Sequence, residues 1–192
     1  MRRLRDIDFV LRKLAWLRTE AIWPNGLRYL WTDAFGIVLL ISLYEDVGEP
    51  RFLEEAEVLV AEVERVLGRE RGIRIGDEPD RDGQYFHYLA MWLYALAVLG
   101  RHNRAYREKG IALAREIHEP SLVPGGGIWW KMKEDLSGPY PGIGFGALDA
   151  FDRYISYRML GKDALSSEIA DMRRLIHGTA SSLSIIRIWS SG

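Results

Sequence analysis

Two stretches of the chain are apolar on every side of a helix, and they constrain the fold more than any other feature. Residues 33–47 and 84–99 carry apolar side chains nearly throughout, with no polar stripe at helical spacing. A helix of this kind has to be covered by other elements on all sides. Residues 51–67 and 103–118 differ, because their apolar side chains form one stripe and charged side chains occupy the rest. This pattern is typical of helices that keep one side in water.

The two kinds of helix alternate. A short turn that begins at Gly48 or Gly100 joins each apolar stretch to the amphipathic stretch after it. A weaker third copy runs from residue 147 to 176 with its turn at Gly161, and an amphipathic helix over residues 7–17 precedes the first copy. The sequence therefore predicts an all-α fold of about three helical hairpins. We expect a partial (α/α) toroid, with a linear solenoid of hairpins as the alternative.

Length and composition narrow the class further. The 192 residues predict one domain over residues 1–180, followed by an irregular tail at 181–192 where the helical pattern stops. A net charge of -1 argues against nucleic acid as a partner. Neither apolar stretch reaches the ~20 residues of a membrane span, and no targeting segment is visible, so we expect a cytoplasmic protein without membrane contact. Two Asn, one Gln and no Cys are typical of thermophilic proteins.

The connections between the predicted helices are unequal. Those within hairpins are tight, whereas residues 68–83 and 119–146 form long loops rich in glycine and aromatic side chains. Long loops of this composition are more often functional than disordered. Because each one leads into an apolar helix, both emerge at the same end of the hairpins. We therefore predict the functional site at that end.

Carboxylates and one histidine are the catalytic candidates at this end. Asp33 and Asp82 hold equivalent places at the start of the two apolar helices, where they could act as acid and base or simply cap the helix. His87 follows Asp82 by about one helical turn and could transfer protons or lie buried in the inner layer. His102, His118 and His177 are predicted to be surface residues. No HExxH, GxSxG or P-loop spacing occurs, so we expect no metal and no cofactor.

The substrate-binding candidates are mainly aromatic. Aromatic faces pack against the C–H faces of sugar rings, and polar groups bind the hydroxyls. Trp129 and Trp130 are the hardest residues to explain as packing, because neighbours in a loop rarely bury together. The predicted binding residues are Trp31, Gln84, Tyr85, Trp129, Trp130, Lys131 and Tyr140.

Four segments share a recognisable pattern: YLWTDAF at 29–35, DRDGQYFHYL at 80–89, WKM at 130–132 and GALD at 146–149. In these segments the chain resembles uncharacterised bacterial and archaeal proteins of the six-hairpin glycosidase-like superfamily. The resemblance spans roughly residues 25–160 and implies an (α/α)6 toroid with a sugar-directed cleft. Relatives in that superfamily include glycoside hydrolases and sugar epimerases. Six hairpins need more residues than this chain has, so only about three fit.

These observations leave several functions open. A carbohydrate-active enzyme that takes a small-molecule or oligosaccharide ligand comes first, as a glycoside hydrolase or, second, as a sugar epimerase. A non-catalytic helical-repeat binding module is the alternative. A prenyl-type cyclase toroid is less favoured, because a clear DDxxD-like metal box is missing. Three hairpins cannot surround two fully apolar helices, so we also expect exposed apolar edges and a homodimer that buries them.

Overall fold

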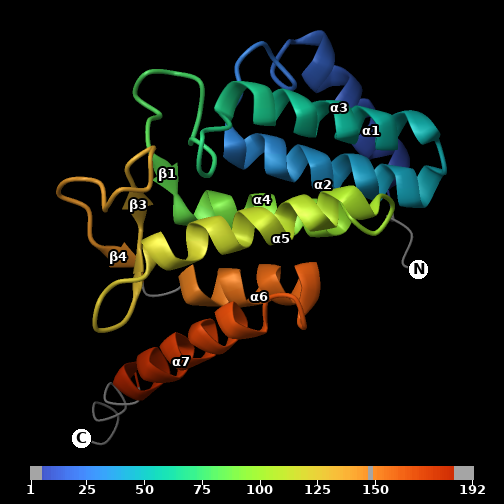
Figure 1. Ribbon diagram of the computed structural model, residues 1–192. Coiled ribbons are helices and arrows are strands. Elements are labelled where there is room, and N and C mark those ends of the chain that lie inside the picture. The colour runs from blue at the N-terminus through green and yellow to red at the C-terminus, as the bar shows by residue number, and fades with distance from the viewer. Residues whose placement is uncertain (1–5, 147–148, 184–192) are drawn as a thin grey trace, which may run out of the picture.

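The computed structural model describes residues 6–146 and 149–183, and α-helices make up most of this part of the chain (Figure 1). The described residues hold α1 (Ile7–Thr19), α2 (Leu30–Val47), α3 (Pro50–Leu67), α4 (Phe86–Leu99), α5 (Arg104–His118), α6 (Asp149–Gly161) and α7 (Ser166–Leu183). A single 3-10 turn, Glu119–Ser121, follows α5. The predicted all-α fold of helical hairpins is confirmed.

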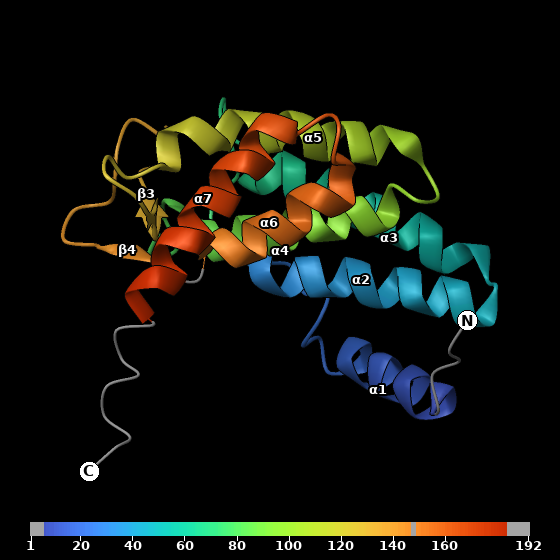
Figure 2. The same cartoon turned by 90° about the horizontal axis from the view of Figure 1, so that it is seen from below.

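The helices form three hairpins, α2/α3, α4/α5 and α6/α7, that stand side by side. Helix α4 packs between α2 and α6, and these three helices form the inner layer. Helices α3, α5 and α7 form the outer layer, as Figures 1 and 2 show from two sides. Helix α1 precedes the hairpins and packs alongside α2 (Figure 2), with Leu14 buried in the common core. None of the described helices combines the length and apolar character that a membrane span needs.

Local sequence signals fix the tight turns. Gly48 ends α2 with a φ of 78°, a left-handed conformation that glycine adopts without steric cost. Pro50 then begins α3, at a position where its missing N–H group is not needed. The Asn103 side chain caps α5 by accepting a hydrogen bond from the backbone N–H of Ala105 at 3.2 Å.

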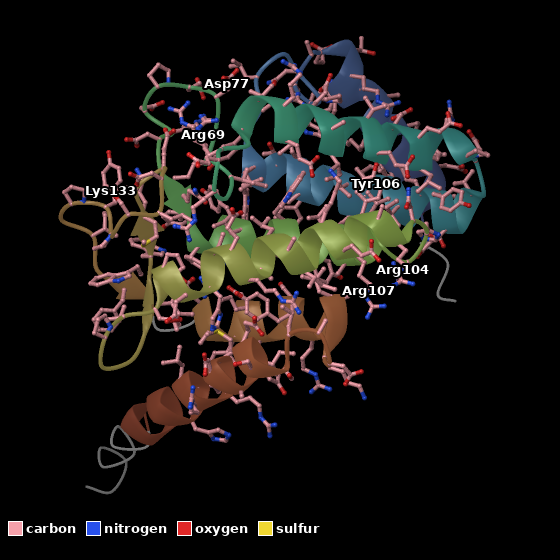
Figure 3. The ribbon with its side chains drawn as sticks, in the orientation of Figure 1. Arg69, Asp77, Arg104, Tyr106, Arg107 and Lys133 are labelled. Atoms are coloured by element: carbon pink, nitrogen blue, oxygen red, sulfur yellow. The ribbon has the colours of Figure 1, made fainter. Side chains whose placement is uncertain are left out.

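The long loops meet at one end of the hairpins, as predicted. Strand β1 (Gln84–Tyr85) pairs antiparallel with β3 (Lys131–Met132), and β2 (Ile128–Trp129) pairs antiparallel with β4 (Phe145–Gly146). The β1/β3 pair connects the loop before α4 to the loop before α6, and the β2/β4 pair lies within the loop before α6. In Figure 3 the labels Arg69, Asp77 and Lys133 mark this loop end, and Arg104, Tyr106 and Arg107 mark the opposite end.

One side of the inner layer is exposed. Helix α4, in the middle, buries Trp92 and Leu93 completely. The prediction that residues 33–47 are buried on every side is wrong, because Phe35 of α2 is largely exposed. On α6, Phe151, Ile155 and Met159 are exposed as well. The described hairpins flank α4 on both sides but leave these residues of α2 and α6 exposed, so the expected exposed apolar edges are confirmed.

His118 is a second correction. We predicted a surface residue, but its side chain is buried and contacts side chains of α6 and α7. Its Nε2 lies 3.1 Å from Oδ2 of Asp171 in α7, and its Nδ1 lies 3.4 Å from the hydroxyl of Tyr157 in α6. The amphipathic pattern of α5 could not reveal this contact, because the partners come from the next hairpin.

The predicted C-terminal tail overlaps the described residues only at its start. Helix α7 extends to Leu183, so residues 181–183 continue the helix and are not irregular. The rest of the predicted tail, 184–192, lies outside the described residues.

Candidate functional site

An aromatic cluster lies at the loop end of the inner layer. Trp31 is in the first turn of α2, and His87 and Tyr88 are in the first turn of α4, so adjacent helices present them at the same level. The ring of Trp31 lies 4.7 Å from that of His87 and 5.0 Å from that of Tyr88, between centroids. Tyr85 continues the cluster, 4.8 Å from Tyr88 and 5.2 Å from Trp130. We call Trp31, Tyr85, Tyr88 and Trp130 the aromatic shelf.

His87, next to the aromatic shelf, contacts an acidic side chain of the third inner helix. Its Nδ1 lies 2.8 Å from Oδ2 of Asp152, in the first turn of α6. The side chains of His87 and Asp152 are 39% and 41% exposed, so solutes can reach both. We call this pair the dyad. All three inner helices therefore contribute to one site: Trp31 from α2, His87 from α4 and Asp152 from α6.

Asp149 lies beside the dyad but is buried, with 7% of the residue exposed. Burial raises the pKa of its carboxyl, because charge is costly away from water. The charges of His87 and Arg153 lower that pKa, whereas the Asp152 carboxylate raises it further. His87, Asp149 and Asp152 each offer one atom that could bind a metal ion, and these three atoms lie within 4.8 Å of one another.

Tyr88 supplies a hydroxyl that stays protonated. Its oxygen lies 2.6 Å from the hydroxyl oxygen of Tyr29, and the two rings meet edge to face. Burial raises the pKa of the Tyr88 phenol strongly, and the hydrogen bond to Tyr29 raises it further. At neutral pH the aromatic shelf therefore presents neutral hydroxyls to the site.

Asp33 is not part of the dyad or the aromatic shelf. Its side chain is buried and contacts Trp23. Its Oδ1 accepts a hydrogen bond from the Trp23 indole at 2.9 Å, and its Oδ2 accepts one from the backbone N–H of Tyr29 at 3.2 Å. The Arg28 guanidinium lies 3.7 Å from Oδ2. Burial raises the pKa of Asp33 despite these contacts. The structure thus places Asp33 at the start of α2 with structural partners, and none of these partners belongs to the dyad.

Asp82 connects the two long loops. Its Oδ1 accepts a hydrogen bond from Nζ of Lys131 at 2.9 Å, and its Oδ2 accepts one from the Tyr140 hydroxyl at 2.7 Å. The Lys131 ammonium also lies 3.7 Å from the centre of the Tyr140 ring. The Tyr140 and Lys131 hydrogen bonds hold the pKa of Asp82 below its usual range. We call Asp82, Lys131 and Tyr140 the loop clamp. Asp82 and Lys131 are close in sequence to Tyr85 and Trp130 of the aromatic shelf, but none of the three contacts described here involves the dyad.

Gln84 and Trp129 also serve the loops. Gln84 is completely buried, and its Nε2 donates hydrogen bonds to the carbonyl oxygens of Arg71 at 2.6 Å and Glu134 at 2.7 Å. Trp129 is half-buried in β2, opposite Phe145. Trp130 follows β2 and is 45% exposed. Of the adjacent tryptophans, Trp130 is therefore the more accessible to a ligand.

Sequence reasoning did not identify Asp152, and it treated Asp149 only as part of a family pattern. A usable signal existed, because both residues stand in the first turn of the third inner helix, the position that Trp31 and His87 occupy in the first two. The weaker apolar pattern of residues 147–160 obscured this equivalence.

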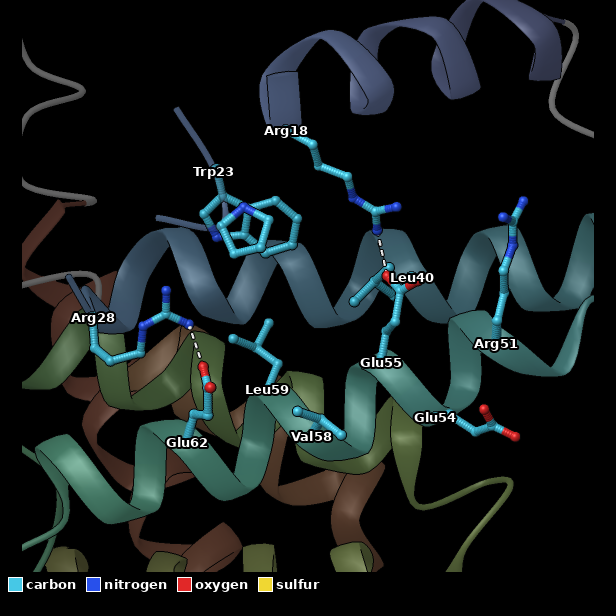
Figure 4. A pocket seen from close by; sticks show the side chains of 11 residues that line it. Arg18, Trp23, Arg28, Leu40, Arg51, Glu54, Glu55, Val58, Leu59 and Glu62 are labelled. Atoms are coloured by element: carbon cyan, nitrogen blue, oxygen red, sulfur yellow. Dashed lines mark hydrogen bonds and ion pairs between the residues drawn. The ribbon is translucent and has the colours of Figure 1, made fainter. Parts of the chain in front are cut away.

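A separate cleft lies away from the dyad. It has a volume of about 590 Å³ between α1, α2 and α3 (Figure 4). Ion pairs of Arg18 with Glu55 and of Arg28 with Glu62 lie along it. Opposite charges are already paired there, and no histidine lines the cleft. This cleft therefore offers less acid–base chemistry than the loop end.

Comparison with known proteins supports the fold. No known protein family and no curated protein matches the sequence. Among solved structures, a D-mannose isomerase matches with a TM-score of 0.70 and 15% identity, over 81% of this chain and 43% of its own. The cellobiose 2-epimerase of Spirochaeta thermophila DSM 6192 matches with a TM-score of 0.67 and 16% identity, over 84% and 45%. This chain has the fold of part of an (α/α)6 toroid.

A family 76 glycoside hydrolase from a bovine Bacteroides thetaiotaomicron strain has the same fold, with a TM-score of 0.63 and 12% identity. It is matched over 80% of this chain and 36% of its own. The chain thus spans less than half the length of each of these structures. At this level of identity the likeness establishes the fold, and it favours the toroid over the linear solenoid.

Proposed function

We propose that the protein acts on carbohydrates and that the dyad is its proton-transfer centre. The observation that carries this proposal is the 2.8 Å contact between His87 Nδ1 and Asp152 Oδ2, open to solvent beside the aromatic shelf. Solved structures of the same fold include proteins described as sugar epimerases, a mannose isomerase and a glycoside hydrolase. Their descriptions agree with the sugar-directed cleft that we expected from the sequence.

The aromatic shelf suits a sugar ring. Trp130 is the most accessible of its members, and Tyr85 and Tyr88 extend from it toward Trp31 and the dyad. Flat aromatic faces bind the apolar C–H faces of a pyranose, and neutral phenols donate hydrogen bonds to its hydroxyls. A sugar that packs on Trp130 and Tyr85 would extend toward His87.

The dyad is arranged for proton transfer. A carboxylate only accepts hydrogen bonds, so Asp152 fixes the proton of His87 on Nδ1 and leaves Nε2 as the base. In the open form of a sugar, Nε2 would remove the proton from the carbon next to the carbonyl, and the electron pair would form an enediolate. Nε2 then gives a proton, exchangeable with solvent at this exposed side chain, to the former carbonyl carbon, and the hydroxyl proton passes from one enediolate oxygen to the other. The product is the isomeric ketose or aldose, so atoms and electrons balance. Asp152 stabilises the imidazolium that forms between the two steps.

A single base favours isomerisation over epimerisation. Isomerisation needs one group that moves a proton between neighbouring carbons on one face of the enediolate. Epimerisation needs the proton to return to the same carbon from the opposite face, which requires a second group there or a rotation of the intermediate. His87 is the only histidine in the aromatic cluster among the residues that the structure describes. We therefore place isomerisation first and epimerisation second.

Hydrolysis of a glycosidic bond, which the sequence placed first, follows these two as a further candidate. Retaining and inverting hydrolases use two carboxyl groups, one protonated and one ionised. Asp33 and Asp82 have separate partners, but Asp149 and Asp152 are close together, and burial raises the pKa of Asp149. This pair favours a hydrolase by its chemistry, whereas the burial of Asp149 argues against direct contact with a glycosidic oxygen.

A panel of free aldoses and ketoses and of chromogenic glycosides tests these candidates. Isomerisation predicts that one aldose and its ketose interconvert until they reach equilibrium, which sugar chromatography detects. Release of the chromophore would support hydrolysis instead. Binding of a sugar without turnover, seen as a thermal shift, would support the non-catalytic module.

We also propose that two copies of the chain associate through the exposed side of the inner layer. The inner helices α2 and α6 expose large apolar side chains, namely Phe35 on α2 and Phe151, Ile155 and Met159 on α6. The solved structures of this fold are more than twice as long as the region matched here, so a second set of hairpins is the natural cover. A C2 dimer would supply it from the same sequence.

Light scattering of the full chain tests this association. A dimer has twice the 22.1 kDa mass of the chain. Ile155→Arg should convert it to a monomer, because Ile155 is 53% exposed on the apolar side. Val58→Arg is the control, because Val58 is as exposed but belongs to the outer helix α3. A 22.1 kDa species at micromolar concentration, without binding of hydrophobic dyes, would contradict the proposal.

A further inference from the structure

Three potential metal ligands converge at the start of α4 and α6. His87 offers an imidazole nitrogen, and Asp149 and Asp152 each offer a carboxylate oxygen, all within 4.8 Å of one another. Asp149 and Asp152 are three residues apart in the first turn of α6, so they lie on one face of that helix. Although we expected no metal site from sequence motifs, the structure assembles this trio from separate hairpins.

A second observation points to a ligand at the trio. Asp149 is more than nine-tenths buried, and its Oδ2 has no hydrogen-bond partner among the residues that the structure describes. A buried carboxylate oxygen without a partner is costly, and a cation is one of the few groups that can compensate it. Arg153, one turn further along α6, does not fill this role. Its guanidinium lies over the Phe86 ring and donates to Ser121.

The backbone leaves space for this carboxylate. A Cβ atom on Gly146 would lie 1.6 Å from Oδ2 of Asp149, so any other residue at position 146 would displace the carboxyl group. Gly146 belongs to β4, which holds the end of the long loop against the start of α6. Strand pairing therefore helps to keep the Asp149 carboxylate at the trio.

We propose that His87, Asp149 and Asp152 bind a divalent transition-metal cation. Imidazole favours Zn²⁺ and related ions, whereas carboxylates favour Mn²⁺ and Mg²⁺, so a set of one nitrogen and two oxygens suits Zn²⁺ or Mn²⁺. Ligands about 2.1 Å from an octahedral cation lie about 3 Å apart when adjacent, close to the 2.8 Å between His87 Nδ1 and Asp152 Oδ2. A tetrahedral Zn²⁺ needs a separation of about 3.4 Å, which a small rotation of the Asp152 side chain would give. The exposed side of the dyad gives the ion and its remaining water ligands access. This inference goes beyond the proposed function and does not depend on it, because the cation needs no sugar.

Calorimetric titration of the chelator-treated full chain with ZnCl₂ tests the site, and electron paramagnetic resonance with MnCl₂ gives a second readout. We expect one ion per chain. Asp149→Asn should weaken binding at least about tenfold while the fold stays intact, since Asn has the same shape. Asp152→Asn, at an exposed position, should have a similar effect and covers the case in which the buried variant fails to fold.

The matched control is Glu45→Gln. Glu45 Oε1 lies 2.9 Å from His102 Nε2, which makes a second histidine–carboxylate pair at the opposite end of the inner layer. Among the described residues, no further His, Asp or Glu lies close enough to this pair to complete a set of three metal ligands. Glu45→Gln should therefore bind the ion as the unmodified chain does. Absence of binding for both ions would overturn the proposal, as would an affinity that neither Asp149→Asn nor Asp152→Asn changes.

Discussion

His87 and Asp152 are 65 residues apart in sequence, yet Nδ1 of the imidazole lies 2.8 Å from Oδ2 of the carboxylate. His102 makes a comparable contact, 2.9 Å from Glu45 Oε1, and its ring meets that of Tyr44 edge to face. The two pairs lie at opposite ends of the inner layer. Only the pair at the loop end adjoins the aromatic shelf, so the chain contains its own control for the proposed chemistry.

Substitution of the proposed base should abolish most of the activity. His87→Gln keeps a polar side chain but removes the proton acceptor, so turnover of the sugar should fall about 10²- to 10⁴-fold. His102→Gln should leave turnover unchanged. Initial rates of both variants, measured with circular dichroism to confirm folding, check this prediction. Equal losses in the two variants would show that His87 has no special role.

Trp130 should contribute to binding rather than to chemistry. Trp130→Ala should raise KM about three- to tenfold and change kcat little, because an exposed aromatic contact is worth roughly 0.5–1.5 kcal/mol. Trp16→Ala is the control, since Trp16 is 49% exposed but lies on α1. Steady-state kinetics of both variants provide the measurement. A kcat effect without a KM effect would argue against a platform at Trp130.

Asp33 should matter for stability. Asp33→Ala removes a partner of the buried Arg28 and leaves the Trp23 indole N–H without its acceptor. Breaking a buried charge pair costs roughly 3–5 kcal/mol of unfolding free energy. The exposed Asp80→Ala should change stability by less than about 0.5 kcal/mol. Urea unfolding of both variants distinguishes this structural role from a catalytic one, for which Asp33→Ala would stay stable and lose turnover.

Asp82 should give the loop clamp a defined pH dependence. Its pKa is lowered in the folded chain by Tyr140 first and Lys131 second, with a smaller contribution from the Arg74 charge. A lowered pKa contributes stability that is present above the unfolded value of about 3.9 and is lost as pH falls through the folded pKa. The stability difference between the unmodified chain and Asp82→Asn should therefore be small but measurable at pH 6 and shrink as pH falls below the unfolded value. Thermal unfolding across that range tests it, and a difference independent of pH would contradict it.

Cation binding and proton transfer should exclude each other. An ion held by Nδ1 of His87 would displace the hydrogen bond to Asp152 and would prevent Nε2 from acting as the base. Saturating Zn²⁺ should therefore inhibit turnover, and chelator should restore it. Asp149→Asn should lose the inhibition but keep the metal-free rate, because Asp149 takes no part in the proposed proton transfer. Faster turnover with Zn²⁺ would contradict this account.

The helices and the functional end were predictable, because both follow from local patterns. The periodicity around Ile37 and Leu93 identified the inner helices, and Gly48 and Pro50 located a turn. His87, Tyr85 and Trp130 were predicted as site residues from their position at the loop end, and the structure brings them together.

The partners of these residues were not predictable. Asp33 and Asp152 both stand in the first turn of an inner helix, and the sequence does not say which one faces the site. Trp23 and Arg28, from the loop before α2, bury Asp33, whereas nothing described covers Asp152 to the same extent. The two-residue strands gave no signal either, because they are too short for a period of two to be seen.

Proton exchange with solvent tests the central claim most directly. The full chain is incubated with the aldose or ketose that it converts, in D₂O, and NMR follows deuterium at the two carbons between which the proton moves. The account predicts deuterium in the product formed by the unmodified chain and by His102→Gln, and none formed by His87→Gln. Conversion without deuterium, or deuterium incorporation that persists in His87→Gln, would contradict the assignment of His87 as the base.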